Sequence, residues 1–355
     1  MLIGGLLALA CLVALEGCAD DHARPADCPT VATTRGVSLS PQGISLAGLP
    51  ADPAALRAFY AEVGSIEGGA VLWNGAWRDD ALDGSDAGTV PRAALAITHQ
   101  AATTCFVPVS VFGWRSGGTP LIKLPANLTN DSTNAEARRQ YTSMLQRFAA
   151  AEHPPFVFLG NENDFYFERA PEDYANWLTL YNQTYDAIKA ASPTTQVGPV
   201  FNYEHLAGVG TLNGWTAAHW QALDAHDLTR VDVVGLTLYP FFSVARADLV
   251  PAEYLALLFS HIGTKPIAVT ETGWPAENLG GLSPPWTPGE QAQLEYVHRL
   301  FALLDGHEVR LVTWLFLHQL QGDGSSANLW RIFGSIALRD ASGTKRPAYE
   351  AWTTR

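Results

Sequence analysis

The 355-residue chain contains no run of basic residues, and charged residues of either sign make up only 16% of it. Lys and Arg together number 22 against 35 Asp and Glu, which gives a formal net charge of -13. Binding to nucleic acid or to an anionic membrane surface requires clustered positive charge, because the partner's phosphates must be neutralised. We therefore expect neither nucleic acid nor a charged lipid surface among the partners.

Cysteine and metal-binding patterns are also sparse. The chain has four cysteines, and neither a Cys/His spacing typical of zinc sites nor an HExxH sequence occurs. We predict no metal site and no cofactor. Cys28 and Cys105 form an even pair, and both a disulfide between them and two free thiols remain open.

The first 17 residues, MLIGGLLALACLVALEG, form an apolar run that is short for a membrane span. Such a run is typical of a signal peptide. The sequence LEGC at residues 15–18 resembles the lipobox of bacterial lipoproteins, which implies cleavage before Cys18 and acylation of its thiol. We expect residues 1–17 to be a signal peptide, 18–30 a linker and 31–355 one folded domain. The protein would be exported, either secreted or held at the cell envelope by lipid on Cys18.

Apolar segments of strand length alternate with segments of helical spacing along the rest of the chain. The eight expected strands are 36–40, 68–73, 105–112, a fourth ending at 162, 195–202, 231–241, a seventh ending at 271, and 309–317. The expected helices are 53–63, 91–104, 134–152, 171–191, 216–226, 251–261, 288–305 and 345–352. This alternation predicts an α/β protein with a single (β/α)8 barrel, also called a TIM barrel. A doubly wound open sheet is the alternative, but no glycine-rich phosphate loop follows the first strand.

Two of the expected strands end in a glutamate. The segment KPIAVTETGWP is apolar up to Glu271, and PPFVFLGNEND is apolar up to Asn161 and Glu162. The carboxyl ends of parallel barrel strands form one rim, where ligands bind and chemistry is done. The sequence therefore predicts that both glutamates lie at the same mouth.

Strict alternation along each strand predicts which side chains share a face. On the seventh strand it groups Glu271 with Ile267 and Val269. On the sixth strand one face carries four residues: Val233, Gly235, Thr237 and Tyr239. If Glu271 points into the barrel, a neighbouring Tyr239 can point there too.

Two glutamates at a barrel mouth suit the cleavage of a glycosidic bond. One carboxylic acid protonates the leaving oxygen, and one carboxylate attacks the anomeric carbon or activates water. A separation of roughly 5 Å between the two carboxyl groups would retain the configuration of the sugar, and a larger gap would invert it.

Four short sequences carry a resemblance to a known group of proteins. LGNEND with Glu162, LYPFF with Tyr239, VTETGWP with Glu271 and VTWLF with Trp314 resemble clan A of the glycoside hydrolases. Family 17, of the β-1,3-glucanase type, and family 53, the endo-galactanases, are the most similar. The resemblance implies a barrel enzyme that cleaves a β-linked glucan or galactan with retention of configuration, and we expect it to act as a monomer on an oligo- or polysaccharide.

The resemblance also implies roles for single residues. Glu162 would be the general acid/base and Glu271 the nucleophile. Asn161 would hydrogen-bond the sugar 2-hydroxyl, Tyr239 would donate to Glu271, and Trp314 would form the floor under the cleaved sugar. Thr237 stands where many clan members carry a histidine. Three more residues near the same rim are expected to contact the substrate: Trp274, Asn202 and Trp73.

Two other functions compete with hydrolysis. The first is a barrel at the cell surface that binds carbohydrate but has lost catalysis, although two intact glutamates argue against it. The second is a metal-dependent hydrolase, which the missing set of His and Asp ligands argues against.

Overall fold

The computed structural model describes residues 33–39, 62–63, 66, 69–76, 107–113, 115–116, 119–120, 135–277, 284–319 and 332–354. Several expectations fall outside these ranges: the signal peptide 1–17, the linker 18–30, lipidation of Cys18, the pairing of Cys28 with Cys105, and the helix at 91–104.

The described strands form one parallel sheet in the order β7-β6-β3-β2-β1-β11-β10-β9-β8. Their bounds are β1 (Thr34–Leu39), β2 (Ala70–Ala76), β3 (Val107–Gly113), β6 (Phe156–Leu159), β7 (Gln196–Gly198), β8 (Val200–Asn202), β9 (Val234–Leu238), β10 (Ile267–Thr272) and β11 (Val309–Trp314). A separate antiparallel pair consists of β4 (Arg115–Ser116) and β5 (Thr119–Pro120).

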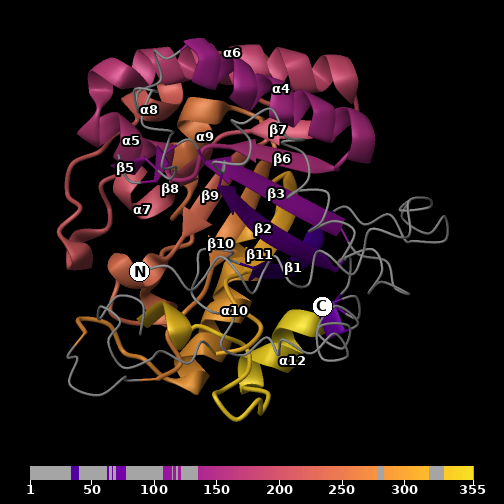
Figure 1. The fold of residues 1–355 in the computed structure, drawn as a ribbon. Coiled ribbons are helices and arrows are strands. Elements are labelled where there is room, and N and C mark those ends of the chain that lie inside the picture. The colour runs from indigo at the N-terminus through magenta and orange to yellow at the C-terminus, as the bar shows by residue number, and fades with distance from the viewer. Residues whose placement is uncertain are drawn as a thin grey trace, which may run out of the picture.

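The two shortest segments of the sheet, β7 and β8, are halves of one barrel strand that is interrupted at Pro199. The first half pairs with β6 and the second with β9, while β1 pairs with both β2 and β11. The sheet therefore closes on itself as the predicted (β/α)8 barrel, with eight strands in the part of the chain that the structure describes (Figure 1).

Helices cover the outside of the barrel (Figure 1). The described α-helices are α4 (Ala135–Glu152), α5 (Asn163–Arg169), α6 (Pro171–Ala191), α7 (Tyr203–Leu206), α8 (Gln221–Asp224), α9 (Ala256–Ile262), α10 (Glu290–Leu304) and α12 (Pro347–Thr353). Short 3-10 helices are η3 (Thr211–Asn213), η4 (Leu228–Arg230), η5 (Pro240–Phe242) and η6 (Ala247–Leu249). None of the helices found in the described ranges is long and apolar enough to cross a membrane.

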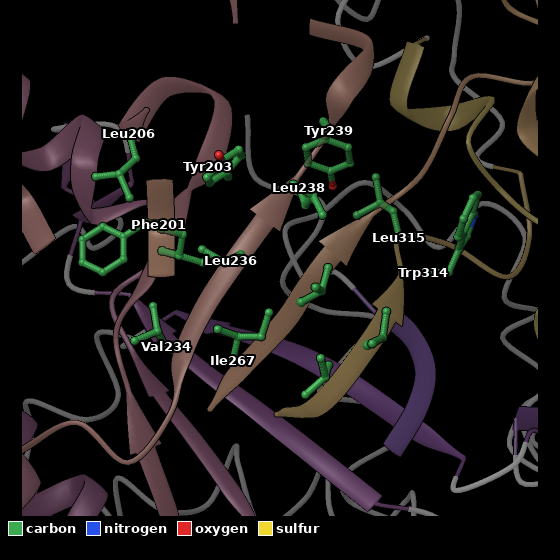
Figure 2. Packing of buried hydrophobic residues seen from close by; sticks show 14 of the residues in the cluster. Phe201, Tyr203, Leu206, Val234, Leu236, Leu238, Tyr239, Ile267, Trp314 and Leu315 are labelled. Carbon is green, nitrogen blue, oxygen red and sulfur yellow. The ribbon is translucent and has the colours of Figure 1, made fainter. Parts of the chain in front are cut away.

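The core has two parts, one on each face of the sheet. A small cluster contains Ala70, Phe156, Phe158, Val200, Val233, Ala268 and Leu311. These residues come from five barrel strands and from the position just before β9. Val200 and Ala268 both pair with Gly235, and Ala268 pairs with Leu311, so they share one face and the cluster fills the barrel interior. The larger cluster packs the other face of the strands against the helices, and Figure 2 shows some of its members on β9 and β10.

One expected helix is much shorter than predicted. The pattern at 216–226 indicates a helix, but α8 covers only Gln221–Asp224. The backbone N–H of His219 donates to Leu206 O at 2.8 Å. This bond ties the segment before α8 to α7 and takes the amide away from a local helical turn.

Candidate active site

Glu162 lies where β6 meets α5, and its backbone is left-handed, with φ 52° and ψ 55°. A left-handed backbone is uncommon for a residue other than glycine, costs about 1–3 kcal/mol and is concentrated at functional sites. Glu162 occupies the N-cap position of α5, yet its side chain makes no capping hydrogen bond. Its carboxyl group instead contacts residues of the neighbouring barrel strands.

Two side chains donate hydrogen bonds to Glu162 Oε1: Asn202 Nδ2 at 3.1 Å and Thr237 Oγ1 at 2.9 Å. The pKa of Glu162 is raised to about 7, chiefly by burial and also by the negative charges of Glu271 and Asp164. The hydrogen bonds from Asn202 and Thr237 oppose this rise. Thr237, which donates to Glu162, lies opposite Glu271 in the sheet, so the two glutamates lie at the same end of the barrel.

A β-bulge in β10 aims Glu271 into the barrel. Val269 pairs with Leu236 of β9, but the next paired residue is Glu271, which lies opposite Thr237, so Thr270 is an extra residue. The pairing with β11 also shifts between Val269 and Thr272. Bulges of this kind redirect side chains and are frequent beside active sites.

The bulge corrects the predicted alternation along the seventh strand. Ile267 and Val269 pack in the cluster between the sheet and the helices, whereas Ala268 lies in the barrel interior. Glu271 therefore does not share a face with Ile267 and Val269; it lies on the barrel side because Thr270 bulges out of the pairing instead of taking that place. On the sixth strand the predicted face is correct, since Val233 lies in the interior cluster and Thr237 contacts Glu162.

Tyr239 follows β9 and connects two glutamates. Its hydroxyl donates to Glu271 Oε2 at 3.0 Å, the contact that the resemblance implied. Its backbone N–H donates to Glu204 Oε2 at 2.9 Å, and Tyr254 Oη donates to Glu204 Oε1 at 3.0 Å. Glu204 is fully buried, and burial raises its pKa to about 8. Glu204 therefore supports the backbone of Tyr239.

Asn202, an expected substrate contact, is 2% exposed, and its polar atoms form hydrogen bonds with other residues of the protein. Its Nδ2 donates to Glu162, its Oδ1 accepts from the His205 backbone N–H, and its own backbone N–H donates to Asp164 Oδ1 at 2.7 Å. Asn202 therefore positions Glu162, and its expected contact with substrate stays a prediction.

Asn161 precedes Glu162 at the end of the fourth barrel strand and is half-buried. Its Oδ1 is buried and has no hydrogen-bond partner among the residues that the structure describes. An unpaired buried oxygen costs about 1–3 kcal/mol, and such groups in native proteins often have a functional role.

Two expected tryptophans lie in the core. Trp314 is fully buried, its indole N–H donates to Ile336 O at 2.8 Å, and its ring packs on Tyr296 and Trp352 of the helical layer. Figure 2 shows it beside the strands and away from Tyr239. Trp274 is also fully buried, with its N–H donating to Thr287 O. Both expectations are corrected, because neither ring has a face open to a sugar.

Trp73 lies within β2, opposite Leu39 of β1 and Ser110 of β3. Its side chain falls outside the part of the chain that the structure describes, and its expected contact with substrate stays a prediction.

The two central carboxyl groups have different surroundings. Glu162 keeps its proton up to about pH 7, while Glu271 faces a phenolic hydroxyl that donates to it. Environments that separate two carboxyl groups in this way allow one to act as an acid and the other as an anion. Among the described side chains, neither glutamate belongs to a cluster of three or more metal-ligating groups.

Sequence comparison finds one family. The model described as glycosyl hydrolase family 53 matches residues 124–296, which include both glutamates and Tyr239. No curated protein matches the chain.

Solved structures share the barrel. The GH5_18 protein of Streptomyces cattleya, in complex with GlcNAc, superposes with a TM-score of 0.63 at 18% identity, covering 90% of this chain and 79% of that one. β-Glycosidase BGL167 gives a TM-score of 0.60 at 14% identity, with 92% and 96% covered. The exo-β-1,4-mannosidase Op5Man5 from Opitutaceae bacterium strain TAV5 gives 0.59 at 14% identity; 90% of this chain is covered, but only 58% of the mannosidase. The family 53 match and the shared barrel both make this chain similar to the glycoside hydrolases of clan A.

Proposed function

We propose that this hydrolase cleaves a β-linked glycan with retention of configuration, using Glu162 as general acid/base and Glu271 as nucleophile. The observation that carries the proposal is the different environment of the two carboxyl groups. Burial and the charge of Glu271 hold a proton on Glu162, and Tyr239 donates to Glu271. Double displacement requires this division between a protonated and an ionised carboxyl.

In the first step Glu271 attacks the anomeric carbon while Glu162 gives its proton to the leaving glycosidic oxygen. The glycosyl–enzyme ester that forms has no charge on Glu271. Because that charge helps to raise the pKa of Glu162, the pKa falls in the intermediate. Glu162 is then ionised and takes a proton from the water that attacks the ester, which frees the sugar and restores both carboxyl groups.

The substrate we propose is a β-galactan or a β-glucan. The match to family 53 and the resemblance to the endo-galactanases favour β-galactan as the first to test. Asn161, with its unpaired Oδ1, would accept a hydrogen bond from a sugar hydroxyl. Phe333, half-buried and 5.2 Å from the Tyr239 ring, takes the place of Trp314 as the candidate aromatic wall beside the cleaved sugar.

The experiment that tests the mechanism combines a glycan panel with a trapping reagent. The protein is incubated with β-galactan, β-1,3-glucan and β-mannan, and separately with activated 2-fluoro glycosides, and any adduct is located by mass spectrometry. We expect hydrolysis of at least one glycan and a label on Glu271. A label on another residue would overturn the assignment of the nucleophile.

Two variants separate the roles, with the exposed Glu172→Ala as control. Glu271→Ala should lose activity on all substrates. Glu162→Ala should lose about 10²–10⁴-fold on glycans but much less on an aryl glycoside whose leaving group needs no proton. Binding of glycans without turnover or adduct would instead favour the carbohydrate-binding barrel.

A further inference from the structure

Three side chains from separate segments meet beside the candidate active site. Glu168 lies near the end of α5, His205 lies in α7, and His219 lies in the segment before α8. One carboxylate oxygen and two imidazole nitrogens from these residues all lie within 4.8 Å of one another. The three segments follow the fourth and fifth barrel strands, and none of these side chains contacts Glu162 or Glu271 through a described hydrogen bond.

His205 is oriented by a buried carboxylate. Its Nδ1 lies 2.7 Å from Asp164 Oδ2, and both side chains are almost fully buried. With Nδ1 engaged, Nε2 is left to face Glu168 Oε2 at 3.4 Å. A carboxylate that holds the other nitrogen of a histidine is a common partner of metal-binding histidines, because it fixes the tautomer and the ring orientation.

His219 is held next to His205. The two rings are stacked with their centroids 4.3 Å apart and an interplanar angle of 15°. His219 Nε2 lies 3.8 Å from Glu168 Oε1, so the carboxylate faces both imidazoles. The side chain of Glu168 is 45% exposed, which leaves a path for an ion to enter from solvent.

We propose that Glu168, His205 and His219 bind one divalent transition-metal ion of the zinc class, with Asp164 positioning His205. Zinc bonds of about 2.0–2.2 Å to nitrogen and oxygen place the ligand atoms of a tetrahedral site about 3.3 Å apart. The 3.4 Å separation of His205 from Glu168 already fits this value. The half-exposed Glu168 has the rotamer freedom to close the wider gap to His219.

The donor set decides the class of ion. Two imidazole nitrogens and one carboxylate suit zinc and its neighbours among the transition metals, whereas calcium and magnesium prefer ligand sets made of oxygen. Three protein ligands leave a fourth position for water. The ion would join α5, α7 and the segment before α8, and Asn202, which contacts Glu162, begins α7. The site does not depend on the proposed hydrolysis of a glycan.

Zinc binding to the full, untagged chain tests the proposal. Zn²⁺ is titrated in competition with a chromophoric chelator, and the number of equivalents and their affinity are compared between variants. We expect the wild type to bind one equivalent of Zn²⁺. The affinity should fall at least about 10-fold in Glu168→Gln and in His219→Ala, because loss of a residue that only supports a metal ligand typically costs 10–100-fold in affinity. Equal binding by the wild type and both variants would overturn the site, as would failure of the wild type to bind.

Two controls exclude other sites. His261→Ala removes a histidine whose Nδ1 also lies 2.7 Å from a carboxylate, that of Asp224, but which has no third ligand in the described structure. Glu271→Gln alters the catalytic pair. Both should keep the zinc equivalent, and its loss in Glu271→Gln would assign the ion to the catalytic pair and reject the proposed cluster.

Two further measurements do not depend on counting equivalents. Zn²⁺ should raise the Tm of the wild type more than that of His219→Ala, because an ion that binds the folded state stabilises it. Crystals grown with Zn²⁺ should give an anomalous peak bonded to Nε2 of His205. A peak elsewhere, with none at this cluster, would contradict the proposal even if Tm rises.

Discussion

At the scale of single residues, Glu162 has a left-handed backbone and a carboxyl group that accepts from two side chains. The two donors differ in what they can contribute. Asn202 also caps α7, so changing it would disturb a helix start, whereas the Thr237 hydroxyl has Glu162 as its described hydrogen-bond partner. Thr237 is therefore the position at which the pKa of Glu162 can be altered most simply.

Thr237→Val should move the pH dependence of hydrolysis. The proposed mechanism requires the acid form of Glu162, so kcat/KM should be high below its pKa of about 7 and fall as pH rises through it. The Thr237 hydroxyl lowers this pKa, and its removal should shift the alkaline limb upward by up to about one pH unit. The measurement is a kcat/KM profile from pH 5 to 10. Thr184→Val, which changes a fully buried threonine of α6, serves as the control. A limb that stays or moves downward would contradict the assignment.

Some site residues could be predicted from their position in the sequence, whereas others are located only by packing in the folded chain. Glu162, Glu271 and Tyr239 stand at the ends of apolar runs, and their ordinal strand numbers bring them to one rim. Thr237 donates to Glu162, and Glu204 accepts from the backbone of Tyr239. Both contacts form between distant segments, and no local sequence pattern predicts them. Trp314 ends the run VRLVTW, in which each face carries both an apolar and a polar residue, so alternation of polarity could not reveal that its ring faces the helices.

At the scale of elements, the fifth barrel strand shows how closely the backbone is packed. β7 ends at Gly198, and Pro199 follows before β8 begins. A Cβ at Gly198 would lie 1.7 Å from Val233 O. The break in the strand therefore occurs where the chain passes directly against the backbone before β9. Within 195–202, predicted as one strand, Pro199 is the residue that marks the interruption, because proline has no N–H to donate to the sheet.

Gly198→Ala should destabilise the fold more than a glycine change that only strains the backbone. The clash is with a backbone oxygen that cannot rotate away, and we expect a loss of about 2–4 kcal/mol in the free energy of unfolding. Gly214→Ala is the comparison, since Gly214 has φ +79° and open space around its Cβ position. It should lose only about 1–2 kcal/mol. Urea unfolding of both variants checks the order, and equal losses would refute the clash.

At the scale of the whole molecule, barrel closure joins the two ends of the described chain. β1 pairs with β11, and Arg35 of β1 donates through a guanidinium nitrogen to Trp352 O of α12. The closed barrel was predictable because the strand–helix alternation repeats along the chain and parallel strands buried on both faces read as continuous apolar runs. The lengths of the helices were less predictable from the sequence. The short α8 is an example, because contacts with distant segments decide where a helix begins.

His226 should make the stability of the whole domain sensitive to acid. It is buried beneath Tyr181, 4.8 Å from that ring, and burial lowers its pKa to about 3. The unfolded chain, with a histidine pKa near 6.5, binds one more proton than the folded one between about pH 6.5 and 3. The free energy of unfolding should therefore fall as pH falls through this window, by at most about 1.4 kcal/mol per pH unit from this residue.

His226→Gln should reduce this acid sensitivity by up to one proton while leaving the Tyr174 hydroxyl bonded to Ala222 O. Urea unfolding at several pH values between 7 and 4 measures the slope. The exposed His298→Gln serves as the reference for a histidine that unfolding does not uncover. An unchanged slope in His226→Gln would show that other groups govern acid unfolding.

The bulge at Thr270 divides β10 into two stretches. Ile267 and Val269 pack against the helices, whereas Glu271 faces the barrel interior. Up to Val269 the side chains alternate in one phase, and from Glu271 onward they alternate in the opposite phase. Substitutions at Ile267 and Val269 could therefore change thermal stability without altering a residue on the same face as Glu271. Deletion of Thr270 would join Val269 directly to Glu271 in regular alternation, so the bulge would be lost while Glu271 stays opposite Thr237 and Thr272 opposite Leu238.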